Sequence, residues 1–387
     1  MKKVLLISQY FPPDITAASF RIGALHTYLL GNGVDADVLT TTPHKSVLLE
    51  NIQNGELLKS EEQVHRVSVK SKRHILQYVE FLMKTRHFTR GNKNYDWIIV
   101  SSPPLSVFQV AKRFLPRAKI LLDVRDLWPD APVAAGKMSK GLMYVLFKKY
   151  EQMMYKTASV VSAVSRPTAQ YIRDIVPEKD VFVVYNGVPA EDLEEMAKWR
   201  NGFAKGRNGG LKIAYAGNLG LLQGLEVVPD AMELVKDLEV DFSFIGSGVL
   251  EKTIKEKAAE KRNISFVPPM ARKELIPFIA READVLFINL KKDWILEKTI
   301  PSKLFDYLLL GKPVIAGIKG EGKEILEETG AAVFFEQDSP ASLAEAIKKM
   351  NRNYSVYAKN ASSKMPALIK RYEREKQFSA ILERIAR

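Results

Sequence analysis

Two segments of this 387-residue chain carry side chains whose types and spacing suit chemistry, and the first is residues 300–307, IPSKLFDY. Ser302 precedes an apolar helical run and is predicted to cap it. Lys303 then lies in the first turn, where its charge opposes the helix dipole unless an anion lies between them. Asp306 follows one turn later and could accept hydrogen bonds from a ribose diol. Lys303 is therefore either a surface lysine with a small cost in stability or, as we predict, an ammonium that binds a pyrophosphate together with the helix amides.

The second segment, DVRDLWPD at residues 123–130, directly follows an apolar run typical of a buried strand. It combines three carboxylates with Arg125 and Trp128. The carboxyl ends of parallel strands are where open α/β sheets bind their ligands. A structured loop with an Arg–Asp pair explains any single one of these residues, whereas the cluster as a whole predicts a functional site.

Three glycine-rich turns indicate which classes of nucleotide-binding protein this chain could belong to. Residues 217–220 (GNLG), followed by Gln223 and Gly224, close a strand-like run and would let the backbone approach a phosphate. Residues 246–248 (GSG) lack the third glycine of a dinucleotide fingerprint, which disfavours hydride transfer. Residues 317–324 (GIKGEGKE) resemble a P-loop, but Glu324 stands where Ser or Thr must bind Mg²⁺, so an ATPase is rejected.

The composition excludes several other kinds of site. A chain that is 46% hydrophobic and 27% charged is predicted to be globular. It contains no cysteine, which excludes disulfides, thiolate zinc sites and a cysteine nucleophile. The five histidines show no ligand spacing, so no metal site is expected. No run approaches the ~20 apolar residues of a membrane span. The N-terminal MKKVLLIS is too short for a signal peptide, and we expect a cytoplasmic protein.

The net charge of +13 is concentrated in the first 190 residues, and most densely in residues 64–94. Within that region, an apolar stripe at helical spacing predicts a basic amphipathic helix. The helix could pack on its own domain, or it could dock on an anionic surface. Phospholipid is the favoured surface, because no nucleic-acid-binding motif is present. The stripe consists of Ile75, Leu76, Val79, Leu82 and Met83.

Strand-like and helical runs alternate along the whole chain. Several strands are continuous apolar runs, which is typical of parallel strands covered on both faces. The helical runs include 19–30 and 140–156, and in the latter Leu142, Leu146 and Met153 predict a core stripe. The predicted strands are 3–8, 36–40, 64–69, 97–101, 119–123, 159–163 and 181–185, then 212–216, 241–245, 264–267, 284–288, 313–316 and 332–335.

The α/β pattern pauses once, at residues 191–210, which are charged and then glycine-rich and are predicted to form a linker. The linker separates a first domain, residues 1–190, from a second, residues 211–364. Two doubly wound parallel sheets facing across a cleft are therefore predicted. The basic segment from about 365 to 387 has no strand after it and is predicted to cross back to the first domain.

At these residues the chain resembles the family 4 glycosyltransferases of the GT-B fold, which have two Rossmann-like domains. It is most similar to the bacterial branch that builds O-antigen, capsule and exopolysaccharide. The resemblance covers essentially the whole chain and rests on the order and spacing of its motifs. They are QYFPPDITAASFR (9–21), DVRDLWPDAP (123–132), VYNGV (184–188), YAGNLGLLQGLE (215–226), IGSG (245–248), ISFVPPM (264–270), EADVLFI (282–288) and TIPSKLFDYLLLGKPVIA (299–316).

The resemblance implies that the second domain binds a nucleoside-diphosphate sugar. Asp306 would meet the ribose, and Lys303 would hold the diphosphate with the backbone of the segment Thr299, Ile300, Pro301 and Ser302. Asn218 and Gln223 stand where many relatives carry Arg and Lys, which makes Lys303 more important. Either Glu297 or Lys298 would take the place of the first Glu of the family motif. The remaining implied donor contacts are Gly217, Gly246, Phe266, Val267 and Pro268, the last three beside the base.

The resemblance also implies residues in the first domain and a reaction. Asp126 would lie beside the anomeric carbon, and Arg21, Arg125 and Asp130 would lie on the acceptor side. The implied reaction is metal-independent sugar transfer, with retention of configuration, from a UDP-sugar. The implied acceptor is an undecaprenyl-diphosphate-linked sugar. The basic region 64–94 would then bring the enzyme to the anionic inner face of the plasma membrane as a peripheral protein.

Two other classes of function stay open at this stage. A sugar-nucleotide epimerase shares the two-domain architecture, but it would need acid and base groups of the carboxylate and histidine type. A basic nucleic-acid-binding protein would explain the charge alone. Product analysis without an acceptor distinguishes the first class, and salt-dependent oligonucleotide binding distinguishes the second.

Overall fold

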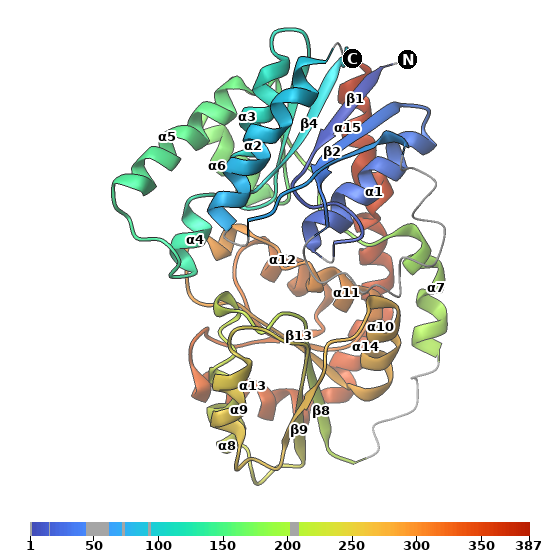
Figure 1. Ribbon diagram of the computed structural model, residues 1–387. Coiled ribbons are helices and arrows are strands. Elements are labelled where there is room, and N and C mark those ends of the chain that lie inside the picture. Colours follow the sequence, from blue (N-terminus) through green and yellow to red (C-terminus); the bar gives the residue numbers. More distant parts are fainter. Residues whose placement is uncertain (1, 15, 44–61, 72–73, 92–93, 202–208) are drawn as a thin grey trace. The chain divides into compact units, whose positions relative to one another are not determined.

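The computed structural model describes residues 2–14, 16–43, 62–71, 74–91, 94–201 and 209–387. The chain divides into two compact units, each built on one parallel sheet (Figure 1). Unit 1 comprises Met1–Tyr185 and Glu375–Arg387, and unit 2 comprises Asn186–Arg374. The two predicted α/β series are therefore confirmed.

Unit 1 contains a seven-stranded sheet in the order β3-β2-β1-β4-β5-β6-β7, with every pairing parallel. The central strands are continuous buried runs, as expected for strands covered by helices on both faces. All seven predicted strands are confirmed, with ends that differ by one or two residues. They are β1 (Lys3–Ile7), β2 (Asp35–Thr41), β3 (Val64–Val67), β4 (Trp97–Ser102), β5 (Lys119–Val124), β6 (Val160–Ala163) and β7 (Val181–Val183).

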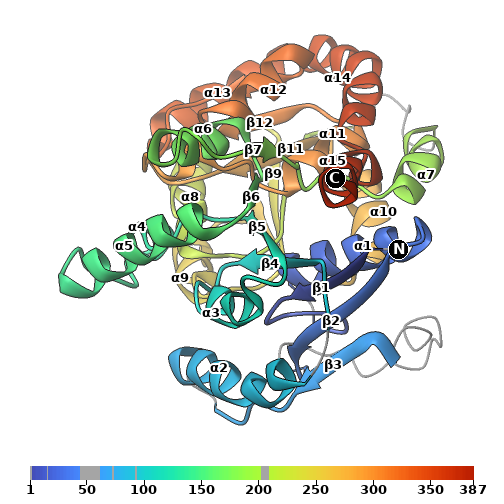
Figure 2. The ribbon, with the colours of Figure 1, turned by 90° about the horizontal axis from the view of Figure 1, so that it is seen from above.

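Helices cover both faces of this sheet (Figure 2). α1 and α15 lie on one face and share a hydrophobic core with the central strands. α2, α3, α5 and α6 lie on the other face, as right-handed crossovers require when the strand order changes direction. The helices are α1 (Ala17–Gly31), α2 (His74–Arg90), α3 (Val107–Ala111) with the 3₁₀ turn η3 (Lys112–Phe114), α4 (Asp130–Ala134), α5 (Leu142–Thr157), α6 (Arg166–Ile175) and α15 (Arg374–Ala386).

Unit 2 contains a six-stranded parallel sheet in the order β10-β9-β8-β11-β12-β13. Its core is rich in aromatic rings, with Phe242 lying 5.3 Å from Phe287 and 4.8 Å from Phe244 between ring centroids. All six predicted strands are confirmed here as well. They are β8 (Leu211–Ala216), β9 (Val240–Ile245), β10 (Ile264–Val267), β11 (Val285–Asn289), β12 (Val314–Gly317) and β13 (Ala332–Phe334).

The helices of unit 2 follow its strands in regular alternation. Ser339 caps α13 by accepting a hydrogen bond from the Ser342 amide at 3.2 Å. The helices are α7 (Ala190–Asn201), α8 (Val227–Glu233), α9 (Glu251–Ala258), α10 (Arg272–Glu282), α11 (Lys303–Leu310), α12 (Glu321–Thr329), α13 (Pro340–Arg352) and α14 (Tyr354–Ile369), with the 3₁₀ turns η4 (Leu221–Gln223), η5 (Leu296–Lys298) and η6 (Lys370–Tyr372).

Within the predicted linker, residues 191–210, the part from 191 to 201 is a helix. α7 has Glu191 and Asp192 in its first turn and Lys198 and Arg200 in its last, a distribution that matches the helix dipole. It packs on α10 and α11 of unit 2. The boundary between the units consequently lies at residue 185 rather than 190. Residues 202–208 of the predicted linker lie outside the described residues.

The C-terminal segment returns to unit 1 ten residues later than predicted, from Glu375. Residues 365–374 belong to unit 2, where Val188 and Glu373 form a parallel β-bridge. In α15, Phe378, Ile381 and Ile385 are fully buried in the unit 1 core. Their spacing of three and four residues places them on one helix face.

Of the stripe predicted to be core in residues 140–156, Met153 is partly buried, but Leu142 and Leu146 are exposed. Only the second half of α5 is buried, at Glu151, Met154 and Tyr155. Figures 1 and 2 show the N-terminal half of α5 projecting from the body of unit 1. The reason is that no strand lies beneath these first turns, so the apolar face has nothing to cover.

Candidate active site

The strand order of unit 2 reverses direction between β8 and β11. In open α/β sheets, ligands bind at this switch point, outside the carboxyl ends of the strands. Residues 217–220 follow β8, and β11 leads through η5 to α11. Most of the donor residues expected from the sequence are therefore carried by segments at this edge of the unit 2 sheet.

The loops after β8, β9 and β10 lie backbone against backbone. The Gly217 amide donates to Ile245 O at 2.9 Å, and the Gly246 amide donates to Val267 O at 3.0 Å. A Cβ added to Gly246 would lie 2.2 Å from Gly217 O, and both glycines have φ near +130°. Only glycine allows this approach and this conformation, which explains both residues.

Lys303 is the buried cation of this region. Its Nζ lies 3.6 Å from the centroid of the Tyr215 ring and has no hydrogen-bond partner among the described residues. The Tyr215 hydroxyl donates to Asn218 O at 2.6 Å and so fixes the ring beneath the ammonium. Burial lowers the pKa of Lys303 to about 7, and the charge of Asp306 opposes this shift. The ammonium thus lies inside unit 2 with an unfilled capacity to bind an anion.

The first turn of α11 adds further free donors. Ser302 occupies the predicted N-cap position, but its side chain makes no capping hydrogen bond. The Leu304 and Phe305 amides bond to Pro301 O and Ser302 O. In the part of the chain that the structure describes, the Ser302 and Lys303 amides have no partner. A helix start with free amides beside an ammonium is a suitable place for a phosphate group.

Asp306, the expected ribose ligand, is held by a residue that the sequence did not single out. Arg272 Nη1 donates to Asp306 Oδ1 at 2.7 Å, and Nη2 donates to Asp192 Oδ2 at 2.5 Å. Partial burial lowers the pKa of Arg272, but the two carboxylates raise it above its usual range. One Asp306 oxygen is thus engaged by Arg272. No local spacing could have revealed this triad, because its members are 34 and 80 residues apart.

The other expected donor residues make local contacts. Glu297 pairs with Lys319 at 3.3 Å, and Lys298 Nζ lies 5.8 Å from the Trp294 ring. Thr299 donates to Leu296 O at 3.1 Å, while Ile300 is buried. Gln223 Oε1 lies 3.3 Å from the Tyr215 hydroxyl oxygen. Phe266 stacks on Phe244 at 5.3 Å, followed along the chain by Val267 and Pro268.

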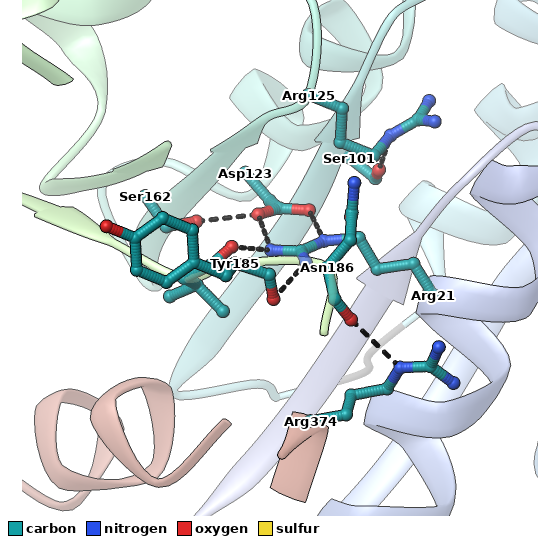
Figure 3. A network of polar contacts seen from close by, with 9 residues as sticks. Arg21, Ser101, Asp123, Arg125, Ser162, Tyr185, Asn186 and Arg374 are labelled. Atoms are coloured by element: carbon teal, nitrogen blue, oxygen red, sulfur yellow. Dashed lines mark hydrogen bonds and ion pairs between the residues drawn. The ribbon is translucent and has the colours of Figure 1, made fainter. Parts of the chain in front are cut away.

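In unit 1, Arg21 forms a buried ion pair with Asp123 (Figure 3). Its Nε and Nη2 donate to the two Asp123 oxygens at 2.9 and 2.8 Å, and further bonds reach Val184 O and Tyr185 O. Burial would raise the pKa of Asp123, but Arg21 holds it below its usual range. These contacts show that the guanidinium ties α1 to β5 and to the end of the unit. The acceptor-side role of Arg21 stays a prediction.

Asp130 is likewise engaged inside unit 1. It accepts from the Tyr144 hydroxyl at 2.8 Å and forms an ion pair with Lys148 at 2.5 Å. Lys148 also pairs with Glu151 at 2.5 Å and donates to the Tyr171 hydroxyl. This network anchors α5 and gives Asp130 a structural role. The acceptor-side role of Asp130 stays a prediction.

Arg125 and Asp126 complete the segment after β5. Arg125 donates to Ser101 Oγ at 2.8 Å and to Pro103 O at 2.7 Å, which fixes the loop to the end of β4. Asp126 is exposed and makes no hydrogen bond or ion pair with the described residues. Of the three carboxylates in DVRDLWPD, Asp126 alone is therefore available to a ligand.

The network around α5 gives a testable pH dependence. Burial raises the pKa of Glu151 to about 7, although Lys148 and the Tyr155 hydroxyl lower it. As pH rises from 4.5 to 7, the unfolded chain loses this proton while the folded protein keeps it, so the wild-type free energy of unfolding should fall. Glu151→Gln should reduce this fall by up to about 3 kcal/mol.

The measurement is urea unfolding at several pH values. The exposed Glu239→Gln variant serves as the control and should retain the wild-type slope. An unchanged slope in Glu151→Gln would show that Glu151 is ionised in the folded protein throughout this range.

Helix α2 confirms the basic amphipathic segment predicted within residues 64–94. Its buried face is Gln77, Phe81 and Thr85, whereas Leu76, Val79 and Met83 of the apolar stripe are exposed. Lys84 pairs with Glu80 at 2.7 Å, and Arg86 and Arg90 are exposed. Lys72, Arg73 and Lys93, with the side chain of Ile75, lie outside the described residues. Among the described helices, none is long and apolar enough to cross a bilayer.

Comparison with known proteins agrees with this geometry. Residues 19–192 match the family described as Glycosyltransferase Family 4, and residues 210–353 match Glycosyl transferases group 1. The chain is 26% identical over 295 residues to the probable glycosyltransferase WbjE of Pseudomonas aeruginosa, which covers 70% of this chain and 69% of that protein. It is 24% identical to the putative colanic acid biosynthesis glycosyl transferase WcaI of Escherichia coli K12, which covers 61% of this chain and 60% of that protein.

The fold has close counterparts among solved structures. Anabaena HepE, crystallised in complex with UDP-glucose, superimposes with a TM-score of 0.70 at 15% identity over the full length of both chains. The two family matches follow one another along the chain in the order of its two sheets. The chain belongs to the family 4 glycosyltransferases of the GT-B fold.

Proposed function

We propose that this glycosyltransferase moves a sugar from a UDP-sugar to an undecaprenyl-diphosphate-linked saccharide, with retention of configuration and without a metal ion, in bacterial cell-surface polysaccharide synthesis. The name of WbjE supports glycosyl transfer, and the name of WcaI, which refers to colanic acid biosynthesis, supports the polysaccharide assignment. The UDP-glucose bound to HepE supports the donor class. The enzyme would act in the cytoplasm at the inner face of the plasma membrane.

The observation that carries the proposal is the Lys303 ammonium, which has no hydrogen-bond partner among the described residues and lies beside the first turn of α11, where the Ser302 and Lys303 amides are also free of described partners. Cleavage of the bond between the anomeric carbon and the diphosphate oxygen leaves one further negative charge on the diphosphate, while positive charge develops on the sugar. A preorganised ammonium and oriented amides stabilise that charge more in the transition state than in the ground state. The proposed role of Lys303 is therefore electrostatic stabilisation of the leaving group.

The remaining proposed roles keep the assignments implied by the resemblance. The free oxygen of Asp306 is proposed to bind the ribose, with Arg272 orienting the carboxylate. Phe266, Val267 and Pro268 are proposed to contact the base, and Gly217, Asn218, Gln223 and Gly246 the phosphates. Glu297 or Lys298 is proposed to contact the donor sugar, and Asp126 is the proposed carboxylate for the anomeric carbon. The exposed cations of α2 are proposed to attract the protein to anionic lipid.

The test is thermal unfolding with a panel of UDP-, GDP- and dTDP-sugars. A ligand at 100 times its Kd adds about 2.7 kcal/mol to the folded state. For a unit of this size we expect an increase in Tm of roughly 5 °C with the correct nucleotide and much less with the others. No shift with any of them would contradict the proposed donor class.

Product analysis by NMR then tests the chemistry. Transfer to a lipid-linked saccharide with the donor's anomeric configuration supports the proposal. A UDP-sugar epimer formed without any acceptor would favour the epimerase instead. Oligonucleotide binding without a UDP response would favour a nucleic-acid-binding protein.

A further inference from the structure

The N-terminal half of α5 presents four exposed aliphatic side chains that no part of unit 1 covers. We call Leu142, Met143, Val145 and Leu146 the α5 tip. Leu142 is 76% exposed and Leu146 is 50% exposed. Contiguous apolar surface of this kind on a folded protein marks an interaction site more often than a solvated helix.

The α5 tip is built on a firmly held helix. Tyr144, within the tip's own first turns, donates to Asp130 at 2.8 Å. One to two turns later, Lys148 pairs with Asp130 and Glu151, and Tyr155 donates to Glu151 at 2.8 Å. The polar contacts therefore bind one side of α5 to unit 1 while the aliphatic side chains remain free. Figure 2 shows this end of α5 projecting away from the strands of unit 1.

The charge around the α5 tip indicates what covers it. Residues 131–150 contain four lysines and no Asp or Glu. Lys137, Lys140 and Lys149 are exposed. A second copy of the chain would bring these lysines against their own equivalents, which is unfavourable. An anionic bilayer instead accepts aliphatic side chains below its headgroups and lysine ammonium groups at the headgroup level.

Helix α2, which lies on the same face of the unit 1 sheet as α5, also exposes large hydrophobic side chains. α2 packs on α3 and exposes Leu76, Val79 and Met83. The turn after α3 reaches α5 through Lys112, whose Nζ lies 3.9 Å from Met153 Sδ. Both exposed stripes thus belong to helices that cover one face of the unit 1 sheet (Figure 2).

We propose that the α5 tip inserts into the interfacial region of an anionic phospholipid bilayer, with Lys137, Lys140 and Lys149 at the headgroups. This deepens the proposed function, because its purpose rests on a lipid-linked acceptor. Attraction through α2 would then be screened by salt, whereas insertion of the α5 tip would persist. The α5 tip is accordingly the element that retains the enzyme on the membrane.

The absence of cysteine from the sequence allows a direct measurement, because one introduced cysteine is labelled without background. Leu142→Cys is labelled with an environment-sensitive NBD fluorophore and mixed with vesicles of phosphatidylcholine and phosphatidylglycerol. We expect at least a doubling of emission with a blue shift, and quenching by lipids that carry a shallow doxyl group. Val356→Cys, in unit 2 and 57% exposed, is the matched control and should not change. Equal responses at both positions, or none at Leu142→Cys, would overturn the proposal.

Vesicle sedimentation of unlabelled protein provides the second test. Leu142→Ser combined with Leu146→Ser should weaken binding to anionic vesicles about tenfold or more, since two buried aliphatic side chains are lost. Leu234→Ser with Val356→Ser, at similarly exposed sites in unit 2, should bind as the wild type does. Equal binding to pure phosphatidylcholine would overturn the role of the lysines. Concentration-dependent dimerisation that only the α5 tip variant abolishes would overturn the bilayer in favour of a second copy.

Both tests omit donor and acceptor, so their failure leaves the proposed glycosyl transfer untouched. Conversely, the tip variant should keep the wild-type response to nucleotide sugars in the thermal unfolding panel. A loss of that response in the tip variant would indicate misfolding. Insertion would then be judged from the NBD-labelled Leu142→Cys protein, provided that this protein keeps the response.

Discussion

Replacing Lys303 by methionine should lower kcat/KM for sugar transfer by about 10²–10³-fold, the effect typical of removing one preorganised donor from a developing anion. Methionine keeps the packing against Tyr215 but removes the charge. Because the wild-type ammonium is buried without a hydrogen-bond partner among the described residues, the unliganded variant should be at least as stable as the wild type. A loss of catalysis without a loss of Tm would show that the substitution acts on the reaction and not on folding.

Donor affinity should also depend on pH through Lys303. The pKa of about 7 in the free protein must rise when a diphosphate binds beside the ammonium, so binding takes up a proton. Affinity for UDP should therefore fall as pH rises from 7 to 9, by up to about tenfold per unit. Isothermal titration across this range measures it, and Lys303→Met should remove the dependence.

Lys312→Met is the matched control for this prediction. Lys312 lies just after α11, and burial likewise lowers its pKa, to about 8. Its ammonium, however, donates to Ala283 O. Lys312→Met should lower Tm and leave UDP affinity and its pH dependence unchanged. If Lys303→Met instead behaved as Lys312→Met does, Lys303 would be a structural residue.

Replacing Arg21 by alanine should destabilise unit 1 by about 3–5 kcal/mol, because it leaves the Asp123 carboxylate buried without its cation. Ser162, which donates to Asp123 at 2.8 Å, cannot replace a bidentate guanidinium. This loss is large compared with the 5–15 kcal/mol that typically separates folded and unfolded states. We expect a lower urea midpoint and reduced yield of folded protein.

The pH dependence distinguishes this mechanism from a lost surface contact. In the wild type, Arg21 holds the pKa of Asp123 low, so its contribution to stability is present above the unfolded value and is lost as pH falls through the folded value. In Arg21→Ala, burial alone raises that pKa, and the destabilisation should shrink as the medium becomes acidic.

A conservative pair of variants completes the test. Arg21→Lys keeps the positive charge but loses the planar guanidinium that bonds both Asp123 oxygens. It should therefore recover only part of the stability that Arg21→Ala loses. Arg21→Met combined with Asp123→Leu removes both charges and should be more stable than Arg21→Ala. If Arg21→Ala had normal stability but no longer bound the acceptor, the result would support the acceptor-side role of Arg21 that the resemblance implies.

The acidic loop DVRDLWPD shows how far local patterns could predict the site. Its position after a buried strand, at the carboxyl end of a parallel sheet, was predicted correctly. The partners of its carboxylates were not predicted. Asp123 pairs with Arg21, which lies 102 positions earlier in the chain, and Asp130 pairs with Lys148 of α5. Only the packing of α1 and α5 around β5 shows that Asp126 alone is exposed.

The two wrongly predicted segments have a common cause. The stripe of Leu142 and Leu146 has the same helical spacing as the buried stripe of Phe378, Ile381 and Ile385, yet the first faces solvent and the second a core. The charged run in α7 has a polar composition typical of linkers, yet it packs on α10 and α11. Helical periodicity defines a face, but it carries no information on what lies opposite that face.

The sequence by itself determined the strands, their parallel arrangement in two sheets and the place of Lys303 at the start of a helix. These depend on local runs of apolar residues and on capping, which act over a few neighbours. The tertiary structure alone decided that the Lys303 ammonium is buried without a hydrogen-bond partner among the described residues, that Arg272 holds Asp306, that Arg21 pairs with Asp123 and that the α5 tip is uncovered. Burial and electrostatic pairing depend on which distant segments fill the surrounding space, and that is settled only when the chain has folded.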